Sequence, residues 1–239
     1  MDPLDPFAAS IPAPTAARPL LGLTLLVVED SRFTCDAIRL VCLKSGARIR
    51  RADCLRSARR HLRVYRPSVV VVDLGLPDGS GLDLVADLTG PGRCIDAVLA
   101  MSGEDALERA ALHAGADGFI SKPITSVAAF QEAVLSLLPP ERRPSGPRVI
   151  TDELVHPDPL AYQDDIAHIA ELLDDQGDGP ALDYAAQFLC GVARSADDLP
   201  LARAAEALAL KRAAGGSAGS EVAVLAGMVQ TRLSQQIAI

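Results

Sequence analysis

Two kinds of segment alternate along residues 21–139. Short apolar runs predict β-strands, and those at 23–28 and 68–74 are continuously apolar, as expected of strands covered on both faces. Segments with apolar residues three and four positions apart predict α-helices between the strands. The predicted strands are residues 23–28, 47–53, 68–74, 96–102 and 117–121, and the predicted helices are residues 33–44, 55–65, 82–88, 104–114 and 127–138.

This regular alternation predicts a doubly wound α/β domain over residues 21–139. Consecutive strand–helix units connect through right-handed crossovers, which make the strands parallel and place helices on both faces of the sheet. We therefore expect a flavodoxin-like five-stranded parallel sheet, in which the first and third strands are neighbours.

The rest of the chain divides into a tail, a linker and a second domain. Residues 1–20 are rich in Ala and Pro and are expected to be disordered. Residues 140–158 continue the proline-rich stretch PPERRPSGPR and are predicted to be a linker. No strand pattern follows, and an all-α domain is predicted over residues 159–239, with helices at 159–173, 181–194, 199–213 and 220–237.

Composition indicates a soluble globular protein. The 239 residues are 49% hydrophobic, enough for one or two domains with a sizeable core. No apolar run approaches the roughly 20 residues that span a bilayer, and the acidic start lacks the basic region of a secretory signal. We expect no membrane association and a cytoplasmic location. The cysteines lack CxxC spacing, so free thiols are expected rather than disulfides or a metal site.

Charge is distributed unevenly along the chain. Residues 151–239 carry 14 Asp and Glu against 5 Lys and Arg, a net charge of −9, whereas residues 1–150 carry 17 against 18. Phosphate backbones are bound by clustered Lys and Arg, so the acidic C-terminal region is a poor candidate for nucleic-acid binding. Nucleic acid is therefore an unlikely partner, and protein partners are favoured.

Acidic residues follow two of the predicted strands at the point where each strand ends. Glu29 and Asp30 follow the first strand, and Asp73 ends the run of four valines in the third. In an open parallel sheet, ligands bind beyond the carboxyl ends of the strands, and these two strands are expected to be neighbours. Three converging carboxylates repel one another unless a cation offsets their charge, and oxygen ligands of this kind suit Mg²⁺.

Two further side chains are expected at the same edge. Ser102 ends the fourth strand with a hydroxyl group, and Lys122 follows the fifth. A hydroxyl, an ammonium and a divalent cation around one carboxylate are the groups needed to stabilise a phosphoryl group transferred to that carboxylate. Asp73 is therefore predicted to be a nucleophile.

Together these features make residues 22 to about 140 resemble the receiver domain of two-component response regulators. The stretch DLGLPDGSG, which begins at Asp73, is similar to the DxxxPxxxG element of that family. The resemblance implies that Asp73 is the phospho-accepting residue and that Glu29 and Asp30 are the acidic pair. It implies that these three carboxylates and the Gly75 backbone carbonyl are the Mg²⁺ ligands, and that Lys122 is the lysine of the site, followed by Pro123, which in this family is often preceded by a cis peptide bond. It also implies two switch residues, the hydroxyl of Ser102 and the aromatic ring of Phe119.

Each of these residues also has an ordinary structural interpretation. Asp73 alone would more often form a turn or cap a helix, and Ser102 could cap the helix that follows it. Lys122 could be a surface charge, and Phe119 could be a core residue. The joint pattern, with all the features in order at suitable spacing, favours the site.

The resemblance implies a signalling reaction. A phosphohistidine on a histidine kinase or histidine phosphotransferase donates its phosphoryl group to Asp73, with Mg²⁺ and Lys122 neutralising the developing charge. The receiver catalyses its own phosphorylation and dephosphorylation, so the protein is primarily a switch rather than an enzyme acting on a separate substrate. The added charge is expected to act through Ser102 and Phe119.

The output of the switch is less defined by the sequence. The stretch LALKRAAGGSAG resembles the HxLKG helix of histidine-phosphotransfer domains, but Leu208 stands at the histidine position and Arg212 at the glycine position. His168 is a weaker candidate acceptor, and a plain amphipathic helical bundle is the simpler interpretation. Three outputs remain open: phosphorylation-dependent binding of a protein partner or of a second copy, DNA binding as a transcriptional regulator, and a phosphate sink without its own output.

Overall fold

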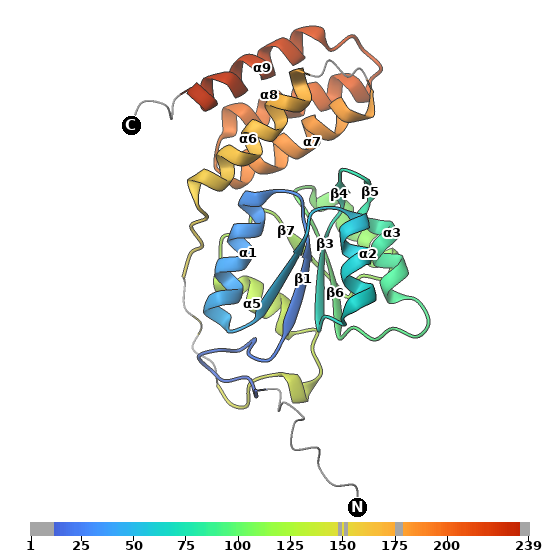
Figure 1. Ribbon diagram of the computed structural model, residues 1–239, viewed down its shortest axis with the longest axis vertical. Helices are drawn as coiled ribbons and strands as arrows, with labels where there is room; N and C mark the ends of the chain where they lie inside the picture. Colours follow the sequence, from blue (N-terminus) through green and yellow to red (C-terminus); the bar gives the residue numbers. More distant parts are fainter. Residues whose placement is uncertain (1–11, 148–149, 151–152, 175–178, 235–239) are drawn as a thin grey trace, which may run out of the picture.

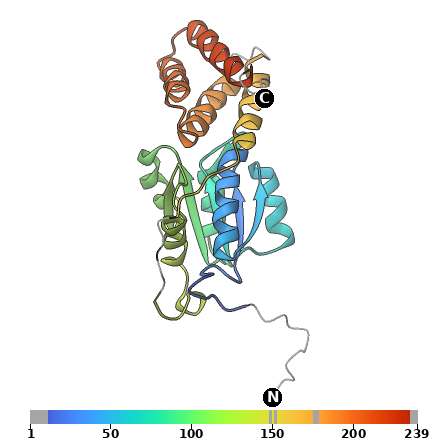
Figure 2. The same cartoon turned by 90° about the vertical axis from the view of Figure 1, so that its left-hand side faces the viewer.

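The computed structural model describes residues 12–147, 150, 153–174 and 179–234. Figure 1 shows an α/β domain with a bundle of helices above it, and Figure 2 gives the view at right angles. The predicted tail lies largely outside the described residues. Its last part differs from the prediction, because Thr15 and Arg18 form a turn and Leu20 is fully buried in the core.

The central sheet has five parallel strands in the order β2-β1-β3-β6-β7. This is the flavodoxin-like order, with the first and third strands of the chain side by side, and it confirms the predicted fold class. The register pairs Leu25 with Val69 and Val28 with Val72. The strands are β1 (Thr24–Val28), β2 (Arg48–Ala52), β3 (Val69–Asp73), β6 (Ala97–Ser102) and β7 (Gly118–Ser121).

Helices cover both faces of this sheet. Alternate residues of β3 enter different cores: Val69 and Val71 pack in one, and Val70 and Val72 in the other. This two-sided burial explains why the strand is continuously apolar. On one side lie α1 (Arg32–Ser45) and α5 (Val127–Leu135), and on the other lie α2 (Leu55–Val64), α3 (Gly81–Thr89) and α4 (Glu108–His113) (Figure 1).

Two local features differ from the sequence prediction. A short hairpin of β4 (Gly75–Leu76) and β5 (Gly79–Ser80) lies between β3 and α3, too short to give a periodic pattern. The helix predicted at 104–114 is a 3-10 turn, η1 (Asp105–Leu107), followed by α4. The cysteines in the described residues are all free, as predicted.

The predicted linker packs partly against the α/β domain. After a second 3-10 turn, η2 (Pro140–Arg142), Leu154 forms a β-bridge with Ser126, and Val155 is buried against the core. The described residues that follow form four helices: α6 (Pro159–Asp174), α7 (Pro180–Ser195), α8 (Leu199–Ala213) and α9 (Gly219–Ser234). The last was predicted to reach residue 237, and residues 235–237 lie outside the described chain.

The helical domain has its own apolar core. Leu189, Leu201, Leu208 and Leu225 are fully buried in it, so the position that would carry a phosphotransfer histidine is a core position here. Among the described helices, none is both long enough and apolar enough to cross a membrane. The domain rests on the carboxyl-terminal edge of the sheet, where α6 and α7 meet the start of α1 (Figures 1 and 2).

The tight turn at the end of β3 generates a first prediction. A Cβ atom on Gly81 would lie 2.0 Å from the backbone carbonyl oxygen of Asp73 and 2.9 Å from the Cα of Leu74. Backbone cannot yield as a side chain can, so Gly81→Ala should lower the free energy of unfolding of the α/β domain by about 3 kcal/mol or more. Urea denaturation followed by circular dichroism measures this change.

Gly90→Ala at the other end of α3 is the matched control. A Cβ atom there meets only ordinary contacts, at 3.7 Å from the Ala86 carbonyl oxygen and 3.9 Å from that of Asp87. We expect a change within about 1 kcal/mol for this variant. Equal stability of the two variants would contradict the close approach at Gly81.

Candidate functional site

Three carboxylates meet where β1 and β3 end. Glu29, Asp30 and Asp73 each offer one oxygen atom, and these atoms lie within 4.8 Å of one another. The pairing of Val28 with Val72 brings the residues that follow them together, as the sequence predicted. Glu29 is fully buried and Asp73 is 6% exposed, so this negative charge is largely removed from solvent.

Lys122 reaches this cluster from the end of β7. Its Nζ lies 2.7 Å from Glu29 Oε2 and 3.0 Å from Asp73 Oδ1. Its backbone N–H donates to the carbonyl of Ser102 at 2.8 Å, and a cis peptide bond joins it to Pro123, as the resemblance implied. The ammonium therefore holds the two carboxylates together.

The other predicted residues divide between the site and the core. Ser102 is buried at the end of β6, where its Oγ accepts from the Glu104 N–H at 3.1 Å, and it lines the same cavity as Asp73 and Gly75. Phe119 is half-buried and packs against the apolar core on the α2, α3 and α4 side. Phe119 therefore packs against one face of the sheet and does not belong to the charged cluster.

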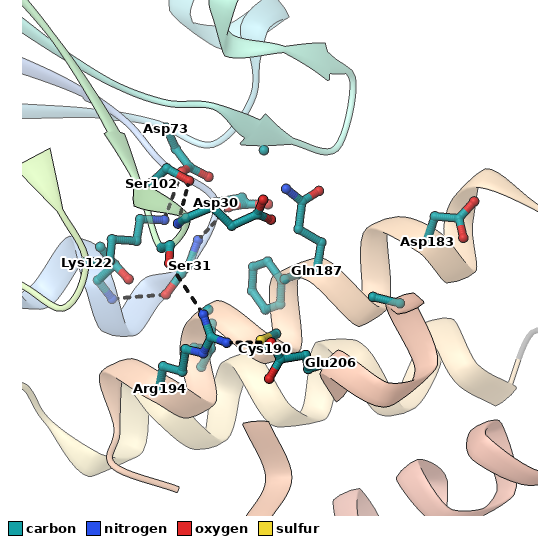
Figure 3. A pocket seen from close by; sticks show the side chains of 18 of the residues that line it. Asp30, Ser31, Asp73, Ser102, Lys122, Asp183, Gln187, Cys190, Arg194 and Glu206 are labelled. Atoms are coloured by element: carbon teal, nitrogen blue, oxygen red, sulfur yellow. Dashed lines mark hydrogen bonds and ion pairs between the residues drawn. The ribbon is translucent and has the colours of Figure 1, made fainter. Parts of the chain in front are cut away.

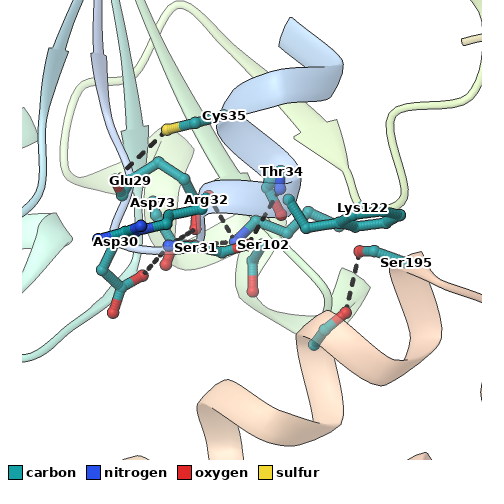
Figure 4. Close-up of polar contacts among 12 residues, drawn as sticks. Glu29, Asp30, Ser31, Arg32, Thr34, Cys35, Asp73, Ser102, Lys122 and Ser195 are labelled. Atoms are coloured by element: carbon teal, nitrogen blue, oxygen red, sulfur yellow. Dashed lines mark hydrogen bonds and ion pairs between the residues drawn. The ribbon is translucent and has the colours of Figure 1, made fainter. Parts of the chain in front are cut away.

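The turn after β1 fixes the acidic pair in place. The backbone N–H of Ser31 donates to Glu29 Oε1 at 3.1 Å and to Asp30 Oδ1 at 3.0 Å (Figure 4). The Ser31 hydroxyl also accepts from the Thr34 N–H at 3.0 Å, which makes Ser31 the N-cap of α1. One residue therefore starts the helix and orients two carboxylates.

Burial raises the pKa of all three carboxyl groups. Desolvation is the largest cause in each case and raises the pKa of Glu29 to about 7, of Asp73 to about 7 and of Asp30 to about 6. Burial alone would lower the pKa of Lys122, but attraction to Asp73 and Glu29 outweighs it and raises this pKa. Once the carboxyl groups ionise, one ammonium does not balance them, and a divalent cation fits the remaining charge and the oxygen ligands.

The helical domain supplies a second wall to this site. A cavity of about 600 Å³ lies between the domains (Figure 3), and residues of α7 and α8 line it opposite Asp73, Ser102 and Lys122. The Tyr184 hydroxyl on α7 donates to Asp30 Oδ2 at 2.5 Å. Burial, followed by the nearby Asp30 charge, raises the pKa of Tyr184, so its proton stays available for this bond.

Asp165 of α6 makes the second contact between the domains. Its carboxylate accepts from the Ser31 hydroxyl at 2.8 Å and from the backbone N–H groups of Arg32 at 2.8 Å and Phe33 at 3.0 Å. These donors have no partner within the first turn of α1, and the helix dipole also favours a negative charge there. Neither Asp165 nor Tyr184 was predicted, because their partners are more than 130 residues away in the sequence.

Comparison with known proteins identifies the α/β domain. Residues 25–134 match the family model described as the response regulator receiver domain. This part of the chain is therefore a receiver domain of the response regulators, which act in two-component signal transduction.

Curated relatives and solved structures are similar to part of the chain. The KDP operon transcriptional regulatory protein KdpE of Escherichia coli K12 is 33% identical over 99 residues, 41% of this chain and 44% of that protein. The virulence transcriptional regulatory protein PhoP of Salmonella typhimurium LT2 is 32% identical over 132 residues, 52% of this chain and 54% of that protein. The chain thus spans about half the length of these relatives. A CheY-like receiver domain from Methylobacillus flagellatus has 25% identity and a TM-score of 0.44, covering 48% of this chain and 98% of its own.

The raised pKa values predict a pH-dependent stability. In the folded, metal-free protein the three carboxyl groups keep their protons until about pH 6–7, whereas the unfolded chain loses them near pH 4. Between about pH 5 and 8 the folded state therefore binds more protons, and the free energy of unfolding should fall as pH rises. Mg²⁺ held by these residues would bind their ionised forms, so we expect its stabilising effect to grow over the same range in thermal unfolding measurements.

Asp30→Asn tests whether the acidic cluster causes this behaviour. Removing one of the three carboxylates should raise the metal-free unfolding midpoint near pH 8 by about 2–4 °C, the shift expected for about 1 kcal/mol in a chain of this size. It should also weaken the stabilisation by Mg²⁺. A variant that Mg²⁺ stabilises as strongly as the wild type would contradict a metal site at Asp30.

Proposed function

We propose that this protein is a response regulator whose Asp73 accepts a phosphoryl group from the phosphohistidine of a histidine kinase or histidine phosphotransferase. The phosphorylated receiver then changes its contact with the C-terminal helical domain. That domain binds a downstream protein, or a second copy of the chain, in a phosphorylation-dependent way. The observation that supports this proposal is that the helical domain rests directly on the predicted phosphorylation site.

Each residue of the cluster has a distinct role in the proposed reaction. An Asp73 carboxylate oxygen attacks the phosphorus atom, and the bond from phosphorus to the donor histidine nitrogen breaks. Lys122 lies close enough to Asp73 to neutralise charge on the incoming group, and Ser102 can donate its hydroxyl proton to a phosphoryl oxygen. Glu29, Asp30, Asp73 and the Gly75 carbonyl would hold Mg²⁺, which stabilises charge on the transferred phosphoryl group.

Electrostatic repulsion couples phosphorylation to the helical domain. Phosphorylation adds about −1.5 to −2 charges. That charge would appear beside Asp30, which bonds Tyr184, and opposite a region with a net charge of −9. The added repulsion favours an arrangement in which the helical domain moves away from the site. The free-energy difference between the docked and the displaced arrangement changes by the amount of repulsion that displacement relieves.

Transcriptional regulation is the second candidate function, because the relatives KdpE and PhoP are named as transcriptional regulators. Binding of the phosphorylated chain to duplex DNA, with an affinity that falls steeply with salt, would support it. Salt-independent association with itself or another protein supports the first proposal.

Phosphoryl transfer tests the central residue of the proposal. We expect the chain incubated with acetyl phosphate and Mg²⁺ to gain the mass of one phosphoryl group in intact-mass spectrometry. Asp73→Asn should show no gain, because an amide oxygen is a poor nucleophile and the product would not form. Asp87→Asn, an exposed carboxylate on α3, is the matched control and should be phosphorylated like the wild type. A full mass gain in Asp73→Asn would contradict the proposal, because the phosphoryl group would then be bound to another residue.

The docking of the helical domain is tested by Asp165→Ala. This change removes three charge-assisted hydrogen bonds to the start of α1 and should weaken docking by about 3 kcal/mol or more. We expect a larger radius of gyration in small-angle X-ray scattering of the unphosphorylated chain.

Asp164→Ala is the matched control for docking. Asp164 is the neighbouring residue, but its pair with Arg32 is exposed, with 53% of the Asp164 side chain accessible. Such surface pairs contribute about 0–1 kcal/mol, so scattering should stay close to that of the wild type. An unchanged radius in Asp165→Ala would argue against a docking role for α6.

A further inference from the structure

One face of α7 is turned toward the phosphorylation site. Tyr184, Gln187, Gly191 and Arg194 follow one another at spacings of three and four residues, which places them on the same side of the helix. Tyr184 bonds Asp30, and Arg194 lies 3.5 Å from the Gly103 carbonyl oxygen. Gln187 lies between these two contacts, and Figure 3 shows its side chain extending from α7 toward the receiver.

The amide of Gln187 lies against Gly75, two residues beyond Asp73. A Cβ atom on Gly75 would be 3.1 Å from Gln187 Nε2 and 3.4 Å from its Oε1. The receiver therefore has no side chain at this point of the cavity wall, and an amide from the other domain occupies the space. Within the described part of the chain, the Gln187 amide forms no hydrogen bond, so both of its polar atoms can bind water.

A phosphoryl group on Asp73 would enter the cavity that Asp73 shares with α7, and its hydrolysis would need a water molecule in that cavity. The attacking and leaving oxygen atoms lie roughly in line, so water must approach phosphorus from the side opposite Asp73. The cavity wall that faces Asp73 from the helical domain includes Gln187, Cys190, Gly191 and Arg194, so we expect water to approach from there. A glutamine amide can orient an attacking water by accepting a hydrogen bond from it with Oε1 or donating one to it with Nε2, as in other phosphoryl-transfer sites.

The charged residues of the helical domain that line this wall are paired with one another, and the Cys190 thiol is only a weak donor and acceptor. Arg194 pairs with Glu206 at 3.1 Å, and Asp183 pairs with Arg212. Asp183 and Glu206 would also repel a phosphoryl group. Gln187 is the neutral residue of this wall that both donates and accepts hydrogen bonds.

We propose that Gln187 is a catalytic residue that orients the water which hydrolyses the aspartyl phosphate on Asp73, so that the helical domain acts as a phosphatase toward its own receiver. This inference rests on the proposed phosphorylation of Asp73. Dephosphorylation then takes place while the helical domain is docked on the receiver, and signalling while it is displaced.

The reaction is balanced without a further reactant. A lone pair of the water oxygen forms a bond to phosphorus as the bond from phosphorus to the Asp73 oxygen breaks. The bonding electrons leave with that oxygen and restore the Asp73 carboxylate. Both protons of the water end on the released inorganic phosphate, which is H₂PO₄⁻ before it equilibrates with solvent.

The decay of the phosphorylated full-length chain tests this proposal. The chain is phosphorylated with acetyl phosphate and Mg²⁺, the donor is removed by rapid desalting, and intact mass is followed over time. Gln187→Ala should lower the first-order rate constant of phosphoryl loss by about ten- to a hundredfold, the effect of losing an oriented reactant. Gln230→Ala on the exposed face of α9 is the matched control and should decay at the wild-type rate.

Gln187→Met separates water orientation from packing. Methionine keeps the length of the side chain beside Gly75 but cannot hold a water in place. We expect it to decay as slowly as Gln187→Ala, and wild-type decay in either variant would overturn the proposal. If the wild type decays and both variants are phosphorylated, only the role of Gln187 is in question. If the wild type gains no phosphoryl group, the proposed function and this inference both fail.

Discussion

The convergence of three carboxylates, two of them buried and one half-buried, around one ammonium is the constraint on which the rest of the structure depends. Parallel strands end at one edge of a sheet, so Glu29, Asp30 and Asp73 are forced together there, with Lys122 between two of them. Like charges in a desolvated site raise one another's pKa values and favour the binding of a cation or a proton. Because the carboxylates repel one another, a charge added at this edge of the sheet changes the pKa values of all three.

The helical domain contacts the clustered carboxylates and the turn that orients them. Asp165 satisfies the exposed N–H groups at the start of α1, and Tyr184 bonds one of the clustered carboxylates. Ser31 joins the acidic pair to the first of these contacts, because its N–H donates to Glu29 and Asp30 and its hydroxyl donates to Asp165. One short turn of the chain, residues 29–31, therefore connects the acidic cluster with the interface between the domains.

The receiver could be predicted almost completely from the sequence, and the interface could not. Strand ends follow from apolar runs, and strand order then brings Glu29 and Asp73 together without further information. The Asp165 and Gln187 contacts depend on how two separately folded domains dock, for which no local pattern exists. Tyr184, Gln187 and Arg194 lie on one face of α7, but a sequence pattern does not show what such a face meets. Leu20 was missed because a single buried residue in an Ala/Pro-rich stretch carries no periodic signal.

Hydrogen–deuterium exchange of the full chain, read by mass spectrometry, is the measurement that tests the coupling between site and helical domain most directly. It compares unphosphorylated protein with protein held phosphorylated by excess acetyl phosphate and Mg²⁺. We expect faster exchange at the first amides of α1, where Arg32 and Phe33 donate to Asp165, and no change there in Asp73→Asn. Identical exchange at these amides in both states of the wild type would contradict it.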